Sequence, residues 1–152
     1  MTAELSAFIR LSSILTGYSP LKLGAAAVAP TYYRLLEKVL QPAIFEALKK
    51  SASAFSAEND AQAEADVAIL LKDRMLGPVL QNLITVWYTG TWSALPAEWK
   101  QQFGDSTYDI THVVSSEAYK GGLQWLAAGG HASGANHQGF AAWSLPPQGI
   151  PA

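Results

Sequence analysis

The stretch VLQNLITVWYTG, residues 79–90, decides the fold class. Its large apolar side chains recur every three or four residues, which is the period of one face of an α-helix. They are Val79, Leu80, Leu83, Ile84, Trp87 and Tyr88. This face is the most apolar in the chain, so it predicts a central helix against which the other segments pack. Gly90 marks the end of that helix.

The N-terminal segment predicts two further helices. Apolar residues at helical spacing run over residues 5–15, and Gly17 follows at the position of a left-handed C-terminal cap. Ser19 and Pro20 then combine an N-cap residue with a proline at the first helical position. A second helix is therefore expected to start there and to continue toward Val28.

Prolines and small polar residues divide the next part of the chain. Pro30 and Pro42 are expected to restart or kink a helix, because proline lacks a donor and clashes with the preceding turn. Between them, residues 32–40 carry an apolar helical stripe. Residues 51–60 are small and polar, so they predict a loop, with Ser56 as the cap of the following helix.

The C-terminal half is less regular. Gly77 and Pro78 are expected to break the helical pattern before the central helix. After the central helix a Trp-rich connection leads to a short turn near Trp99, and Ser115 or Ser116 can cap one last helix. That helix would carry Tyr119, Leu123 and Leu126.

From residue 129 onward, glycine and proline interrupt the chain every few residues and no apolar period survives. We therefore expect an all-α protein: a single-domain irregular helical bundle over residues 1–128, with an extended Gly/Pro-rich C-terminal tail over residues 129–152. The tail carries large apolar residues, which predict that it packs on the domain or on a partner subunit.

The composition favours a permanent partner. Charged residues make up 14% of the 152-residue chain, against about 25% in typical soluble domains, while aromatic residues make up 11%. A surface with so few charges is expected to expose an apolar patch that a partner covers. The net charge of -2 and the lack of a basic cluster argue against nucleic-acid binding. No apolar run approaches the about 20 residues of a membrane span.

The motifs of nucleotide and flavin chemistry are missing from the sequence. We find no dinucleotide fingerprint, phosphate-binding loop or hydrolase nucleophile elbow, so we expect no cofactor and no catalytic residues in this chain. An alternative is an enzyme that uses Asp105, Asp109 and His112 with His131 or His137. Solvated loop carboxylates are the expected state of both aspartates, and the histidine spacing does not predict a metal site.

Aromatic residues near the predicted helix ends and in the tail suit a partner interface, because tryptophan and tyrosine combine large area with a polar group. The residues that we expect there are Trp87, Tyr88, Trp92, Tyr119, Trp125, Phe140, Trp143, Leu145 and Pro146. For Trp87 and Trp125, packing in the core remains the alternative.

Four segments resemble a known family. They are FIRLSSILTG (8–17), ITVWYTG (84–90), SEAYKGGLQW (116–125) and GFAAW (139–143), the last followed by Pro146. In this order they are similar to the small, or gamma, subunits of bacterial membrane-associated FAD-dependent dehydrogenases that oxidise sorbitol, fructose, glucose or gluconate.

The resemblance implies a non-catalytic subunit that binds, stabilises and helps to mature or export a larger FAD-binding catalytic subunit. It also implies a periplasmic complex, membrane-associated in its assembled form, that can include a multihaem cytochrome c subunit. The sequence departs from the family in showing no twin-arginine signal and no cysteine, so association would be wholly non-covalent. A free-standing helical binding or scaffold protein is the other interpretation.

Overall fold

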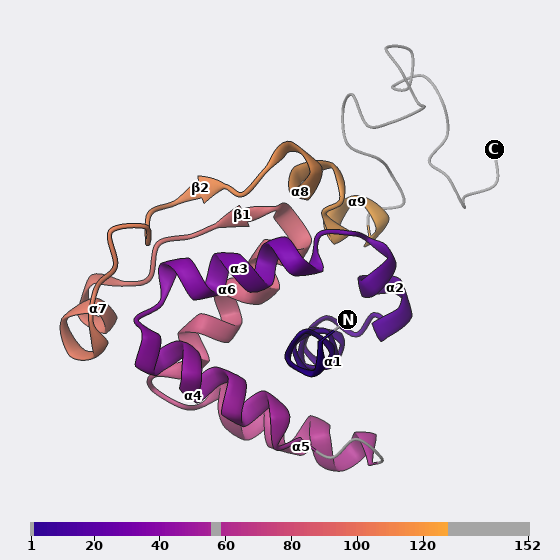
Figure 1. Ribbon diagram of the computed structural model, residues 1–152, viewed down its shortest axis with the longest axis horizontal. Helices are drawn as coiled ribbons and strands as arrows, with labels where there is room; N and C mark the ends of the chain where they lie inside the picture. The colour runs from indigo at the N-terminus through magenta and orange to yellow at the C-terminus, as the bar shows by residue number, and fades with distance from the viewer. Residues whose placement is uncertain (1, 56–58, 128–152) are drawn as a thin grey trace.

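The computed structural model describes residues 2–55 and 59–127, which fold into helices and one small antiparallel sheet (Figure 1). The helices are α1 (Ala3–Thr16), α2 (Pro20–Ala25), α3 (Ala29–Val39), α4 (Pro42–Ser53), α5 (Asp60–Leu71), α6 (Leu76–Thr89), α7 (Ala97–Phe103), α8 (Ser116–Lys120) and α9 (Leu123–Ala127). The strands are β1 (Thr91–Trp92) and β2 (His112–Val113). The predicted all-α class is confirmed.

The helix α1 ends where the sequence predicts and α2 begins there, but α2 ends at Ala25, before Ala27 with its positive φ of 60°, and does not continue to Val28. Gly17 terminates α1 in the left-handed region, with φ of 82°. The Ser19 hydroxyl accepts a hydrogen bond from the Lys22 N–H at 3.1 Å, and Pro20 occupies the first turn of α2. Proline fits there because the first-turn N–H groups have no partner inside the helix.

Both internal prolines restart a helix. Pro30 lies in the first turn of α3 and Pro42 in the first turn of α4, so each begins a helix and kinks none. The predicted stripe on α3 is buried, and its Tyr32 ring meets the Trp87 ring of α6 edge to face with centroids 4.8 Å apart. Such pairs add about 0.5–1.5 kcal/mol beyond area burial.

The start of α5 differs from the prediction. The helix begins at Asp60, where the Asn59 side chain accepts a hydrogen bond from the Gln62 N–H at 3.0 Å. Asn59 directly precedes the first helical residue, which is where a capping side chain can reach the free N–H groups. The prediction of Ser56 as the cap is therefore wrong.

The start of α6 also differs. Gly77 and Pro78 lie inside its first turn, where both are tolerated, and the break falls earlier, after Leu71. The Asp73 carboxylate accepts hydrogen bonds from the N–H groups of Met75 and Leu76. It therefore satisfies N–H groups at the start of α6 that have no partner inside the helix.

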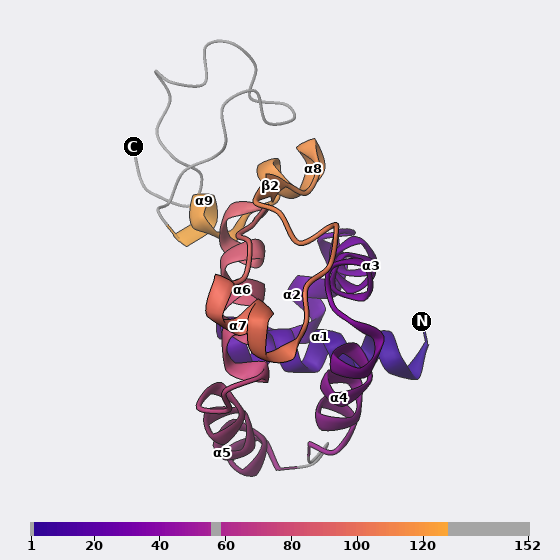
Figure 2. The same cartoon turned by 90° about the vertical axis from the view of Figure 1, so that its left-hand side faces the viewer.

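The helix α6 runs through the middle of the molecule, as predicted (Figures 1 and 2). It contacts α1, α5, α9 and β1, and its inward side chains are buried. These are Leu76, Val79, Leu80, Leu83, Val86 and Trp87. Four of the six residues on the predicted apolar face are therefore in the core, whereas Ile84 and Tyr88 are half-buried.

Two features on the C-terminal side differ from the prediction. β1 pairs with β2 in the register Thr91↔Val113 and Trp92↔His112, and these two-residue strands leave no periodic pattern in the sequence. The single last helix is instead divided into α8 and α9 at Gly121. The predicted tail, residues 129–152, lies outside the described residues.

Candidate partner interface

The helix α6 contacts both α1 and α8, which are far apart in the sequence. The Tyr88 hydroxyl donates a hydrogen bond to the Thr16 carbonyl of α1 at 3.4 Å, and the Tyr88 and Tyr18 ring centroids are 6.4 Å apart. Gly90 lies against α8: a Cβ at this glycine would be 2.5 Å from the Ala118 carbonyl carbon. The ends of α1 and α6 and the helix α8 therefore form one continuous region.

Two of the predicted interface residues lie next to each other in this region. The Tyr119 and Trp125 ring centroids are 5.6 Å apart with an interplanar angle of 75°, and Trp125 Nε1 donates to the Tyr119 carbonyl at 2.9 Å. Tyr119 is 37% exposed and Trp125 is half-buried. Tyr88 is also half-buried, and Gly122, between α8 and α9, lies against the Tyr88 carbonyl. We call Tyr88, Tyr119 and Trp125 the aromatic end.

Two other predicted interface residues lie in the core. Trp87 is 1% exposed and Trp92 is 0% exposed, so neither ring reaches the surface of the described chain. Trp87 packs on Tyr32, and Trp92 Nε1 donates to the Asp109 carboxylate at 2.8 Å. Core packing, the alternative left open for Trp87, describes both residues.

The remaining predicted interface residues belong to the tail. Phe140, Trp143, Leu145 and Pro146 lie outside the described residues. Their role in a partner contact stays a prediction.

Asp109 is not the solvated carboxylate that the sequence predicts. It is 2% exposed, and its Oδ1 atom accepts hydrogen bonds from Trp92 Nε1 and from the Leu95 N–H at 3.1 Å. Lys100 Nζ lies 3.6 Å from Oδ2 and donates to the Asp109 carbonyl at 3.0 Å. Buried carboxylates need this degree of pairing, so Asp109 fixes the connection between β1, α7 and β2.

Of the alternative catalytic loop, Asp105 and Asp109 share Lys100, whereas His112 bonds elsewhere. The Asp105 side chain is 65% exposed and lies 3.6 Å from Lys100 Nζ. His112 Nδ1 is bonded to the Ile110 carbonyl, two residues away. His131 and His137 lie outside the described residues, and among those described no group of three or more histidine, aspartate and glutamate side chains could hold a metal ion.

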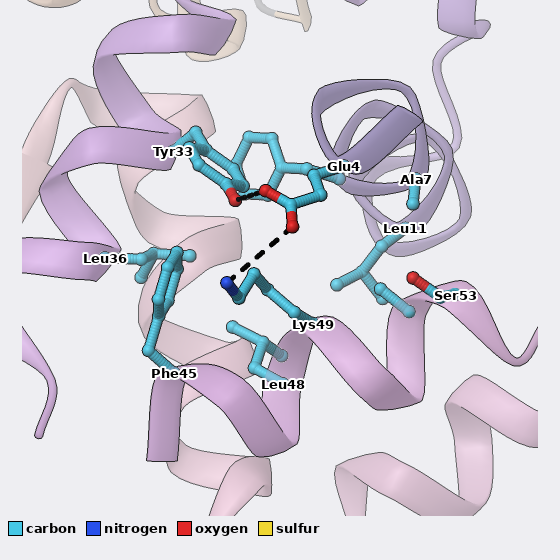
Figure 3. Close-up of a pocket in the computed structure, with 11 residues that line it drawn as sticks. Glu4, Ala7, Leu11, Tyr33, Leu36, Phe45, Leu48, Lys49 and Ser53 are labelled. Atoms are coloured by element: carbon cyan, nitrogen blue, oxygen red, sulfur yellow. Dashed lines mark hydrogen bonds and ion pairs between the residues drawn. The ribbon is translucent and has the colours of Figure 1, made fainter. Parts of the chain in front are cut away.

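A small cleft opens between α1, α3 and α4 (Figure 3). Its walls are apolar side chains, among them Leu11, Leu36 and Phe45, and its volume is about 20 Å³. One water molecule needs at least about 10–15 Å³. The cleft is therefore too small for a sugar or a cofactor.

Polar groups close the mouth of this cleft (Figure 3). The Tyr33 hydroxyl donates to Glu4 Oε2 at 2.9 Å, and Lys49 Nζ lies 3.8 Å from Glu4 Oε1 and 2.7 Å from Glu46 Oε1. Burial and the bond to Glu4 raise the pKa of Tyr33. The bond to Glu46 raises the pKa of Lys49. These groups tie the first turn of α1 to α3 and α4.

The structure also exposes apolar residues that the sequence analysis missed. Tyr108 is 54% exposed, Ile110 is 60% exposed and Val113 is 55% exposed, all within six residues. Tyr108, Ile110 and His112 alternate with Asp109 and Thr111, which is strand-like spacing. That alternation is the signal that could have revealed them.

No helix among the described residues is long and apolar enough to cross a membrane. Comparison of the chain with models of known families, with curated proteins and with solved structures finds no match.

Proposed function

We propose that this protein is the non-catalytic small subunit of a bacterial FAD-dependent sugar or polyol dehydrogenase complex. The observation that carries the proposal is the meeting of three of the four family-like segments at the end of α6. Residues 8–17, 84–90 and 116–125 contribute Thr16, Tyr88 and Ala118 to this single region. Segments that serve one interface are expected to lie together in this way.

The proposed activity is binding. Tyr88, Tyr119 and Trp125 would anchor the FAD-containing catalytic subunit, because aromatic side chains dominate the energetics of interfaces. The tail residues Phe140 and Trp143 would add to the same contact. With no cysteine in the chain, the contact would be held by apolar burial and hydrogen bonds alone.

In this proposal the flavin and its redox chemistry belong to the catalytic subunit, and haem c belongs to the cytochrome subunit where one is present. The small subunit would stabilise the folded flavoprotein and help to mature or export it to the periplasm. Ligands that bind only the folded state stabilise it by mass action, and a partner subunit acts in the same way.

The test is co-expression with a candidate FAD-binding catalytic subunit of such a dehydrogenase, followed by affinity purification and a dye-linked dehydrogenase assay. We expect an active, flavin-loaded complex only when the small subunit is present. An equally active flavoprotein in its absence would contradict the accessory role.

Variants locate the interface within the same assay. The double change Tyr119→Ser and Trp125→Ala is expected to lower recovery of the complex tenfold or more, since anchor residues are worth about 2 kcal/mol each. Ile69→Ser is the matched control, because Ile69 is 71% exposed and lies on α5. A chain truncated before Gly139 tests the tail: unchanged assembly and activity would show that the tail makes no essential contact.

A free-standing helical binding or scaffold protein is the second candidate. One observation favours it: the described helices close a continuous core of their own, with Trp87 and Trp92 fully enclosed. A monodisperse monomer that fails to capture the flavoprotein would support this candidate over the accessory subunit.

A further inference from the structure

A second surface lies away from the aromatic end, where the segment between α7 and β2 runs alongside α3 (Figure 2). A groove of about 270 Å³ separates them. The lining residues are Leu35, Lys38, Val39, Tyr108, Ile110 and His112. Sites for drug-sized ligands and cofactors measure about 300–1,000 Å³, so this groove suits one or two side chains.

Hydrogen bonds hold one wall of the groove in place, although its apolar residues are exposed. The Ser106 hydroxyl donates to the Lys38 carbonyl at 3.2 Å, and the Ala94 N–H donates to Thr111 Oγ1 at 2.9 Å. Between them, buried Asp109 fixes the same segment to Trp92. A surface that is ordered before binding loses less conformational entropy when a ligand arrives.

The charge at the groove favours an anion. Lys38 Nζ lies 4.3 Å from the Tyr108 ring centroid in a cation–π contact. Within the described part of the chain, no carboxylate forms an ion pair with Lys38. His112 Nδ1 donates to the Ile110 carbonyl, so the positive charge that faces a ligand is that of Lys38. A ligand with a carboxylate beside an apolar group would complement Lys38 and the apolar lining of the groove.

The backbone next to the groove favours an extended ligand. The Val114 N–H donates to the Gly90 carbonyl at 2.9 Å, and His112 pairs with Trp92. Hydrogen bonding in antiparallel pairs alternates along the strand, so the N–H and C=O of Val113 point away from β1. An added strand could bond to them, as in recognition by β-augmentation.

We propose that this groove binds an extended peptide segment in which a glutamate or aspartate lies beside a large apolar side chain. The carboxylate contacts Lys38, the apolar side chain enters between Val39 and Ile110, and the peptide backbone pairs with Val113. This inference goes beyond the accessory role. Peptide binding is tested on the isolated chain, so it can fail while the accessory role holds, and the reverse.

The experiment is an NMR titration of the ¹⁵N-labelled full chain with the capped peptide acetyl-Leu-Glu-Leu-amide. We expect saturable shift changes at the amides of Lys38, His112 and Val113. Acetyl-Leu-Lys-Leu-amide should bind at least tenfold more weakly. Absence of saturable changes at these amides, or equal binding of the two peptides, would overturn the proposal.

Variants test the role of the lysine. Lys38→Glu is expected to reverse the preference between the two peptides, and Lys38→Met to abolish it while keeping an apolar stem of similar length. Lys50→Glu makes the same charge change on α4 and should leave the tenfold preference intact. An unchanged preference in both Lys38 variants would show that the groove does not recognise a carboxylate through this residue.

Discussion

Asp109 joins three elements through one buried carboxylate, so its replacement should be costly. Asp109→Ala leaves Trp92 Nε1 and the Leu95 N–H without their acceptor. An unpaired buried donor costs about 1–3 kcal/mol, so we expect the free energy of unfolding to fall by about 3 kcal/mol or more. Urea denaturation of the purified chain measures this loss.

Two further aspartate variants serve as comparisons for the stability loss of Asp109→Ala. Asp109→Asn keeps one oxygen acceptor and should lose less stability than Asp109→Ala. Asp105→Asn, at a carboxylate that is 65% exposed, should change the unfolding free energy by less than about 0.5 kcal/mol. Equal losses of unfolding free energy at Asp105 and Asp109 would show that the buried carboxylate stabilises the fold no more than the exposed one.

Tyr32 presents the opposite case, a buried polar group without a hydrogen-bond partner. Its hydroxyl has none among the described residues, although the side chain is 0% exposed. Tyr32→Phe removes a group that is dehydrated without compensation, so we expect unchanged or higher stability, by up to about 1 kcal/mol. Tyr33→Phe, which loses the bond to Glu4, should instead cost about 0.5–1 kcal/mol. A clear loss in Tyr32→Phe would indicate that an enclosed water satisfies the hydroxyl.

The same tyrosine predicts a dependence on alkaline pH. Burial raises the pKa of Tyr32 from 10.0 to about 12. Between these values the unfolded chain ionises this tyrosine and the folded chain does not, so stability is lost as pH rises. The slope from this one group is about 1.4 kcal/mol per pH unit. Denaturation from pH 9 to pH 11 should show wild type losing more stability than Tyr32→Phe, and parallel curves would contradict this cause.

At the scale of elements, the glycines that end α1 and α6 have the same left-handed backbone conformation but different surroundings. Comparing them distinguishes the backbone strain of a substitution from the steric clash that its Cβ would make. Gly17 (φ 82°) ends α1 in open space, since a Cβ added there would meet no atom within 4 Å. At Gly90 (φ 70°) an added Cβ would lie 2.5 Å from Ala118. Gly17→Ala should cost about 1 kcal/mol, the strain of a left-handed alanine. Gly90→Ala should cost at least about 2 kcal/mol more, because α8 must move away from α6.

Thermal unfolding measures both glycine variants, and NMR shifts report whether α8 moves. We expect displaced signals for residues 116–120 only in Gly90→Ala. Equal losses of stability in the two variants would mean that the contact between α6 and α8 is easily rearranged.

The elements could be predicted where one local signal decides the structure. Proline at Pro20 and Pro42 starts a helix because its lack of an N–H is harmless in the first turn. Competing local signals were harder to rank, as with Ser56 and Asn59. For the sheet, the one local signal was the strand-like alternation over residues 108–112, which ends as β2 begins. Each strand has two residues, and its position depends on the bonds that Asp109 makes to the β1 side.

At the scale of the whole molecule, the sequence could identify aromatic residues but not their position. Trp87 and Tyr88 are adjacent in the chain, yet one is enclosed and the other reaches the aromatic end. Which face of α6 is covered depends on α1, α3 and β1 together. The groove at Lys38 was missed for the same reason, since it joins residues about 70 positions apart that only the tertiary fold brings together.

This difference in position predicts that folding and partner binding can be separated. Trp87→Ala empties the centre of the core and should cost about 3–5 kcal/mol, a large part of the about 5–15 kcal/mol that stabilises a typical domain. Trp125→Ala removes a half-buried ring at the aromatic end and should cost about 1 kcal/mol of folding free energy.

The variant that loses more stability should not be the one that loses more partner binding. Under conditions where both variants remain folded, we expect Trp125→Ala to weaken capture of the FAD-binding subunit tenfold or more, and Trp87→Ala to change it little. Urea denaturation and pull-down of the same preparations supply the two readouts. If capture instead fell in proportion to stability in both variants, the aromatic end would be part of the fold and the partner surface would lie elsewhere on the chain.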